Sequence, residues 1–238
     1  MLDRSVLRIG GAAAMAGAVL GLVANLLHPR ASGVDTSREE LQLVADSDIW
    51  LLDHYLIGWS LALAGVALVC IALSHATEPA RSWGRVAFGF AIGSIAIAFA
   101  GIAVDGRALK EVADAWAASP DDPALIASGD AVAQLALSLF NALIASLFGV
   151  TPIVFGVTML MGERFPRWLG YLAIASGALG VLSSSMIYFA GPTDLSVNYI
   201  FGVASVGYTV WAFVSGWHLW NAPSGSPEPE MANSRAAA

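Results

Sequence analysis

Histidine and aspartate side chains stand at the ends of apolar segments in this chain of 238 residues. His28 follows one such segment, Asp53 and His54 open the next, and Asp105 ends a third. Imidazole and carboxylate groups can together ligate zinc or another divalent ion, and histidine can relay protons because it titrates near neutrality. The candidates for a ligand or proton site are Asn25, His28, Asp53, His54, Asp105, Asp130, Gln134 and Asn141.

The metal hypothesis rests on His28, Asp53 and His54, whose spacing matches no known metal motif. Asp53 and His54 are adjacent, so in a helix their side chains point about 100° apart. At most one of the two is therefore expected to face a given pocket squarely. Polar side chains at helix ends also reach water or cap neighbouring helices. The sequence leaves three interpretations open: interfacial side chains, a proton or polar-ligand site, and a metal site.

The segments that position these residues are long enough to cross a membrane. Apolar residues make up 57% of the chain and charged residues 12%, whereas an average soluble domain has about 25% charged residues. A spanning helix needs roughly 20 mostly apolar residues. Six runs have this length: 7–28, 51–74, 85–104, 131–161, 168–190 and 198–219. They predict an all-α transmembrane domain of six helices over 1–220.

Shorter elements are predicted outside these runs. Residues 36–45 combine a helix-starting signal with an apolar stripe, which predicts a short amphipathic helix at the outer interface. The third helix is expected to continue beyond the membrane until Ser, Pro and Asp residues break it at 119–123. Pro152 lies inside the fourth run and is expected to kink that helix. The tail 221–238 is rich in Pro, Ser and Ala and is predicted to be a disordered cytoplasmic tail.

Charge predicts the orientation of the bundle. If the chain crosses the membrane six times, seven of the eleven basic residues lie on one side: Arg4, Arg8, Arg81, Arg85, Arg164, Arg167 and Arg235. Basic residues in short loops favour the cytoplasm, so both termini are predicted to be cytoplasmic in a cell inner membrane. Most of the 18 acidic residues fall on the outer side, and the net charge is −7. This balance argues against nucleic-acid binding. The acidic residues are interpreted as solubilising and helix-capping charges, with weak attraction of cations as the alternative.

Pairs of small residues four positions apart indicate close helix packing. Such pairs let two backbones approach each other in lipid. They are Gly17 and Gly21 in the first run, Gly89 and Gly93 in the third, and Ser176 and Gly180 in the fifth. We expect a compact bundle from these pairs.

The sequence contains no catalytic motif, and it indicates no particular cofactor. The leading hypothesis is therefore a non-catalytic subunit or small binding bundle, associated with a membrane partner or a hydrophobic ligand. The second is a proton- or cation-coupled transporter that uses the outer Asp and His residues. The third is an intramembrane metal-dependent enzyme. Expected partners are the lipid bilayer and other membrane-protein subunits.

Two stretches carry a resemblance to a known group of proteins. One runs from Leu139-Phe140-Asn141-Ala142 to Phe165-Pro166-Arg167-Trp168-Leu169-Gly170, and the other is Asp48-Ile49-Trp50-Leu51-Leu52-Asp53-His54. Over about 45–220 the chain resembles a family of bacterial six-helix membrane proteins with a domain of unknown function. The resemblance implies a six-helix fold and a bacterial inner membrane, and it transfers no catalytic residue.

Overall fold

The computed structural model describes residues 3–29, 37–75 and 77–222, which form helices and no strand. The elements, with η marking π-helical segments, are α1 (Arg4–Leu27), α2 (Ser37–Asp46), α3 (Trp50–Leu73), α4 (Ala80–Ile102), η1 (Ala103–Ala108), α5 (Leu109–Ala118), α6 (Pro123–Leu143), η2 (Ile144–Val150), α7 (Thr151–Met161), α8 (Arg167–Ala190), η3 (Leu195–Phe201) and α9 (Gly202–Trp220). The predicted all-α fold is confirmed. Residue 36 of the predicted amphipathic helix and the predicted tail beyond residue 222 lie outside the described residues.

Within the described residues, six helical runs are long and apolar enough to span a membrane, as predicted, which makes this a multi-pass membrane protein. They are Arg4–Leu27, Trp50–Leu73, Ala80–Ala118, Pro123–Met161, Arg167–Ala190 and Leu195–Trp220. The third and fourth runs contain 39 residues each. At about 1.5 Å per residue such a helix is nearly twice as long as the ~30 Å hydrocarbon layer. These two runs therefore extend beyond the bilayer, and the predicted break separates them.

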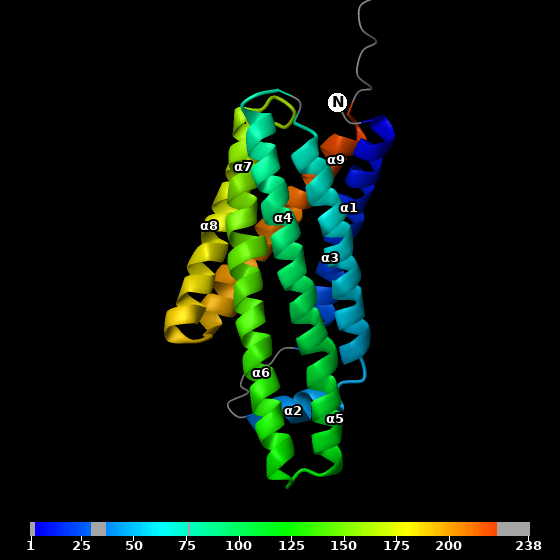
Figure 1. Ribbon diagram of the computed structural model, residues 1–238, viewed down its shortest axis with the longest axis vertical. Helices are drawn as coiled ribbons and strands as arrows, with labels where there is room; N and C mark the ends of the chain where they lie inside the picture. Colours follow the sequence, from blue (N-terminus) through cyan, green and yellow to red (C-terminus); the bar gives the residue numbers. More distant parts are fainter. Residues whose placement is uncertain (1–2, 30–36, 76, 223–238) are drawn as a thin grey trace, which may run out of the picture.

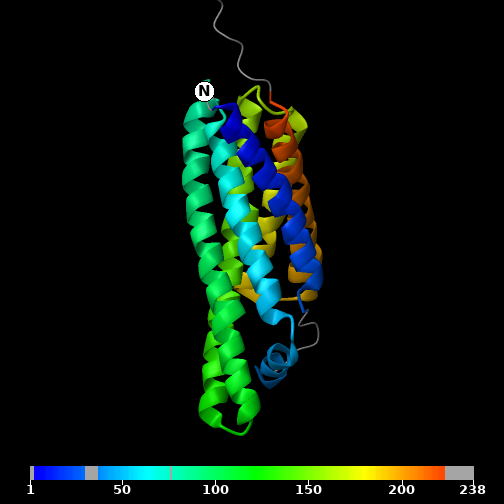
Figure 2. The same cartoon turned by 90° about the vertical axis from the view of Figure 1, so that its right-hand side faces the viewer.

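The two ends of the described chain lie at the same end of the bundle (Figure 1). The turns after α3 and after α7 lie there too, and we call this the terminal end. At the opposite end, α5 and the start of α6 form a hairpin that projects beyond the other helices, with α2 beside it (Figures 1 and 2). We call α2, α5 and the start of α6 the cap. The basic turns are thus grouped at the end away from the cap.

The cap has a small apolar core of its own. Leu41 and Val44 from α2 are buried there with Leu109 and Trp116 from α5, and Trp50 closes the core from the side of α3. The predicted amphipathic helix therefore exists, and its apolar stripe packs against protein. Lys110 supports this contact, because its Nζ donates to the carbonyls at the end of α2 and pairs with Asp114 at 3.0 Å. The core fixes the position of α3 relative to η1.

Small residues bring most of the spanning helices into contact. A Cβ added to Gly17 would lie 3.1 Å from the side chain of Leu63, so α1 packs closely on α3. A Cβ added to Gly180 of α8 would lie still closer to the backbone of η2, against the carbonyl of Phe148. Gly89 and Gly93 differ, because no atom of the described residues lies within 4 Å of a Cβ added to either one. The α4 pair does not pack inside the bundle, contrary to expectation.

The fourth run continues through Pro152 without ending. The prediction for this proline was a kink; the structure has a π-helical segment, η2, just before it. Proline lacks an N–H group and crowds the carbonyl four residues earlier. A wider helical turn there accommodates the ring, and the run still spans Pro123–Met161.

Candidate functional site

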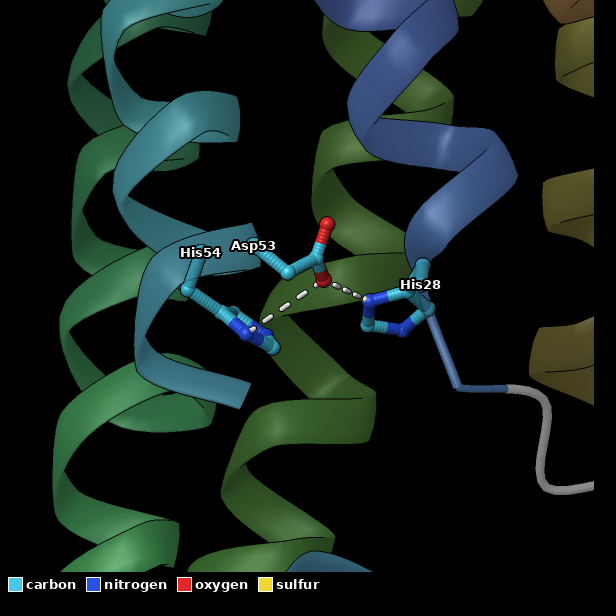
Figure 3. Close-up of side chains that lie close together, drawn as sticks. All are labelled: His28, Asp53 and His54. Atoms are coloured by element: carbon cyan, nitrogen blue, oxygen red, sulfur yellow. Dashed lines mark hydrogen bonds and ion pairs between the residues drawn. The ribbon is translucent and has the colours of Figure 1, made fainter. Parts of the chain in front are cut away.

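Four of the predicted site residues meet where the cap joins the bundle. His28 follows α1, Asp53 and His54 lie in the first turns of α3, and Asp105 lies in η1. Nδ1 of His28 is 2.6 Å from Oδ2 of Asp53, and Nδ1 of His54 is 3.7 Å from the same oxygen (Figure 3). Nε2 of His54 is 3.1 Å from Oδ2 of Asp105. We call these residues the His–Asp cluster.

Asp53 is the buried centre of this cluster. Its side chain is 0% exposed, whereas those of His28 and Asp105 are about one third exposed. Oδ2 faces the two imidazole rings, while Oδ1 is buried with no hydrogen-bond partner among the described residues. A buried carboxylate is costly unless positive charge or hydrogen-bond donors compensate it. One of the two carboxylate oxygens thus has unused capacity to accept a bond.

His54 is held at both ring nitrogens. Nδ1 lies 2.8 Å from the carbonyl oxygen of Trp50, one turn earlier in α3. A carbonyl only accepts hydrogen bonds, so Nδ1 donates to it. Nε2 faces Asp105 and also donates when that carboxylate is ionised. His54 then carries a positive charge between Asp53 and Asp105.

Asp53 and His54 both face the cluster, although adjacent helical residues were expected to diverge. The ring of His54 turns back along the helix towards Trp50, which brings Nδ1 near the Asp53 carboxylate. Both side chains are buried as a result. One atom from each of His28, Asp53 and His54 lies within 4.8 Å of the other two, which is a grouping able to hold a metal ion.

The π-helical turn η1 places Asp105 beside His54. A π-helix has wider turns than an α-helix and is often found at functional sites. The carbonyls of Asp105 and Gly106 both accept from the indole Nε1 of Trp50, at 3.2 and 3.1 Å. Trp50 is only 5% exposed. This buried side chain therefore ties η1 to α3.

Gly106 allows η1 to approach the ring of His54. A Cβ added at this position would lie 2.7 Å from Cβ of His54, which no real side chain tolerates. Sequence reasoning missed Trp50 and Gly106 as supporting residues. Their only signal was position: Trp50 stands one helical turn before His54, and Gly106 follows Asp105.

Negative charge accumulates around the cluster. The pKa of Glu40 in α2 is raised above its ordinary value, first by burial and then by the nearby carboxylates of Asp105 and Asp130. Glu40 in the cap is therefore close enough to Asp105 of the cluster for their charges to interact. Several carboxylates around a partly buried site attract positively charged ligands.

The remaining predicted residues do not join the cluster. The side chains of Asn25, Asp130 and Gln134 are exposed. Asn141 lies elsewhere, where its Oδ1 accepts from the hydroxyl of Ser184 at 2.8 Å and links α6 to α8. The other two histidines, His75 and His218, both lie beside Phe165 at the terminal end.

Comparisons with protein-family models, with curated protein sequences and with solved structures found no match for this chain. The resemblance to bacterial six-helix proteins therefore remains an expectation. Conclusions about function rest on the geometry of the chain itself.

Proposed function

We propose that this protein is a small, non-catalytic membrane binding bundle whose His–Asp cluster binds a cation. The observation that carries the proposal is the buried carboxylate of Asp53, with Oδ1 free of any hydrogen bond among the described residues. Burial makes the negative charge of Asp53 unfavourable when the imidazole rings beside it are neutral, and a bound cation then compensates that charge. The exposed sides of His28 and Asp105 give the ligand a route from the surface.

Cation binding is tested by its effect on stability. The full chain, purified in mild detergent without chelator, is heated with Na⁺, Mg²⁺, Ca²⁺, Mn²⁺ or Zn²⁺ added singly. When its free concentration is 100 times its dissociation constant, a ligand that binds only the folded state adds about 2.7 kcal/mol to the free energy of unfolding. We expect at least one cation to raise the melting temperature of the wild type. Asp53→Asn should lose this response.

Asp121→Asn is the matched control, because Asp121 is an exposed carboxylate in the turn of the same cap. It should respond to the cation as the wild type does. A wild-type melting temperature that none of the five cations changes would contradict the proposal. An equal response of the wild type and Asp53→Asn would contradict it too.

Carriage of the cation across the membrane is the alternative that uses the same cluster. Vesicles that enclose a cation-sensitive dye separate the two functions. Binding without flux supports a binding bundle. Flux that Asp53→Asn abolishes would instead make the protein a transporter.

A second candidate function is that of a subunit in a membrane complex. The specific observation is the open pair Gly89 and Gly93 on α4, beside exposed Phe88 and Ile92. Small residues on an outward helix face favour close contact with another membrane helix.

For location, we propose the inner membrane of a bacterium, with both chain ends in the cytoplasm.

A further inference from the structure

The donor atoms of the His–Asp cluster point to one class of cation. Two imidazole rings and one carboxylate converge there from α1 and α3 (Figure 3). We propose that the ligand is a divalent transition-metal ion of the zinc class, bound by His28, Asp53 and His54. This inference rests on the cation-binding function proposed above and names its ligand.

The type of donor separates zinc from the commoner divalent ions. Magnesium and calcium take oxygen ligands and bind imidazole poorly. Zinc accepts nitrogen and carboxylate oxygen together, at about 2.0 to 2.2 Å. Three protein ligands leave a fourth tetrahedral position for water or another small ligand. Asp53 can also offer Oδ1, the oxygen that has no partner among the described residues.

The geometry requires only small movements. Two ligand atoms of a tetrahedral zinc ion lie about 3.3 Å apart when each is about 2 Å from the metal. Nδ1 of His28 and Oδ2 of Asp53 are closer than this, at 2.6 Å, while Nδ1 of His54 is slightly farther from Oδ2, at 3.7 Å. The three ligand atoms lie within 4.8 Å of one another. Displacements of about 1 Å, together with a rotation of the His54 ring away from the carbonyl of Trp50, bring all three to coordinating distances. The ring of His28, one third exposed at the end of α1, has room to adjust.

His54 can ligate through Nδ1 without leaving an unsatisfied carbonyl. Its Nδ1 proton and the bond to Trp50 must both be lost, because a metal-bound nitrogen is deprotonated. The carbonyl of Trp50 lies one helical turn before His54, so it keeps the backbone bond that an α-helix makes at this spacing. The loss of the side-chain bond therefore costs little.

Asp105 acts in this proposal as a positioning residue. Histidines that bind a metal usually donate their other ring N–H to a carboxylate, which fixes the ring and raises its basicity. Nε2 of His54 already has this bond to Asp105 at 3.1 Å. Two ionised carboxylates, Asp53 and Asp105, also balance the two positive charges of the metal ion. The cluster then holds no net charge when both rings are neutral.

Equilibrium dialysis of the full chain in mild detergent, after removal of metals with a chelator, tests the proposal. The dialysis buffer contains Zn²⁺, with Ca²⁺ and Mg²⁺ in separate arms, and bound metal is measured by elemental analysis. We expect one zinc ion per chain, in line with a single three-residue site. His28→Ala should weaken zinc binding at least 100-fold without unfolding the chain, because the ring is partly exposed. His218→Ala, at the terminal end, is the matched control and should bind zinc normally.

Two further variants distinguish coordination from a purely structural effect. Asp105→Asn should keep the stoichiometry and weaken binding by about 10- to 100-fold, as for other residues that support a metal ligand. His28→Cys replaces nitrogen with a thiolate, which is also a zinc ligand. With Co²⁺ as a spectroscopic probe, this variant should gain a sulfur-to-metal charge-transfer band that the wild type lacks. A residue with only a packing role produces no such band.

The outcomes separate this inference from the proposed function. If Na⁺, Mg²⁺ or Ca²⁺ stabilises the protein through Asp53 while zinc does not bind, the zinc proposal is overturned and cation binding stands. If none of the cations binds, both fail. Zinc that remains bound at wild-type affinity in both His28→Ala and Asp53→Asn is adventitious, and this result also overturns the proposal.

Discussion

Buried polar side chains behave differently at the two ends of this molecule. Asp53 near the cap is surrounded by imidazole rings that can compensate its charge. His75 at the terminal end is 5% exposed, and its Nε2 has no hydrogen-bond partner among the described residues. Burial, and then the guanidinium of Arg164, lower the pKa of His75 from 6.5 to about 4. His75 is therefore neutral in the folded protein at physiological pH.

This burial predicts a loss of stability in mild acid. In the unfolded chain His75 takes up a proton below about pH 6.5, whereas in the folded chain it does so only near pH 4. The unfolded state thus binds more protons between these values, and the free energy of unfolding falls as pH decreases from about 6.5 to about 4. Over this pH range the titration of His75 lowers the free energy of unfolding by about 3 kcal/mol.

Unfolding of the wild type and His75→Gln by denaturant, measured from pH 4 to pH 7, checks this prediction. The variant should lose most of the decrease that the wild type shows in this range. His218→Gln is the matched control, because His218 also contacts the ring of Phe165. An identical pH dependence in the wild type and His75→Gln would show that His75 does not titrate as described.

At the scale of elements, irregular helix geometry positions the site. The run from α4 to α5 stays helical, but the wider turn of η1 changes the direction in which the following residues point. Trp50 stabilises this turn through its bonds to the carbonyls of Asp105 and Gly106. The cap core, which contains Trp50, therefore connects the packing of α2 and α5 to the cluster.

The open face of α4 leads to a prediction about assembly. Leucine in place of Gly93 should leave the fold of the single chain intact, since a Cβ added there meets no neighbouring helix of the described residues within 4 Å. The same change should prevent close approach of a second membrane helix. We expect native mass measurements in mild detergent to show a larger complex for the wild type than for Gly93→Leu.

Gly202→Leu is the control for the assembly prediction, because Gly202 on α9 is open in the same way. It should keep the mass of the wild type. A wild-type protein with the mass of one chain, without a bound partner, would remove the subunit hypothesis.

At the scale of the whole molecule, an even number of spanning helices places both chain ends on one side. The terminal end also carries the basic turns, and the cap stands at the other end (Figure 1). From the positive-inside rule we propose that the cap, with its His–Asp cluster, lies on the outer face. A cation from outside the cell would reach the cluster without crossing the bilayer.

Cysteine labelling of intact cells tests this orientation. Asp121→Cys introduces an exposed thiol in the turn of the cap, and Glu163→Cys introduces one in a turn at the terminal end. A membrane-impermeant thiol reagent should label Asp121→Cys alone. Cys70 is buried and should contribute little background. Labelling of Glu163→Cys alone would reverse the proposed orientation.

Composition and local pattern were sufficient to determine the architecture of this protein. The six spanning runs, the short helix at α2 and the break before α6 were predicted because hydropathy and helix-ending residues act locally along the chain. The same reasoning found the His and Asp residues at helix ends. It did not show which of them meet.

Only the tertiary structure decided that His28, Asp53, His54 and Asp105 form one site, and that Asn25, Asp130 and Gln134 do not. Convergence depends on how each helix is rotated about its own axis. One extra residue in a turn rotates the direction of all following side chains by about 100°. The π-helical turn at η1 introduces such a change, and the sequence gives no clear signal for it. The open face at Gly89 and Gly93 depends on rotation in the same way, because a small residue favours packing only when its side of the helix faces a neighbour.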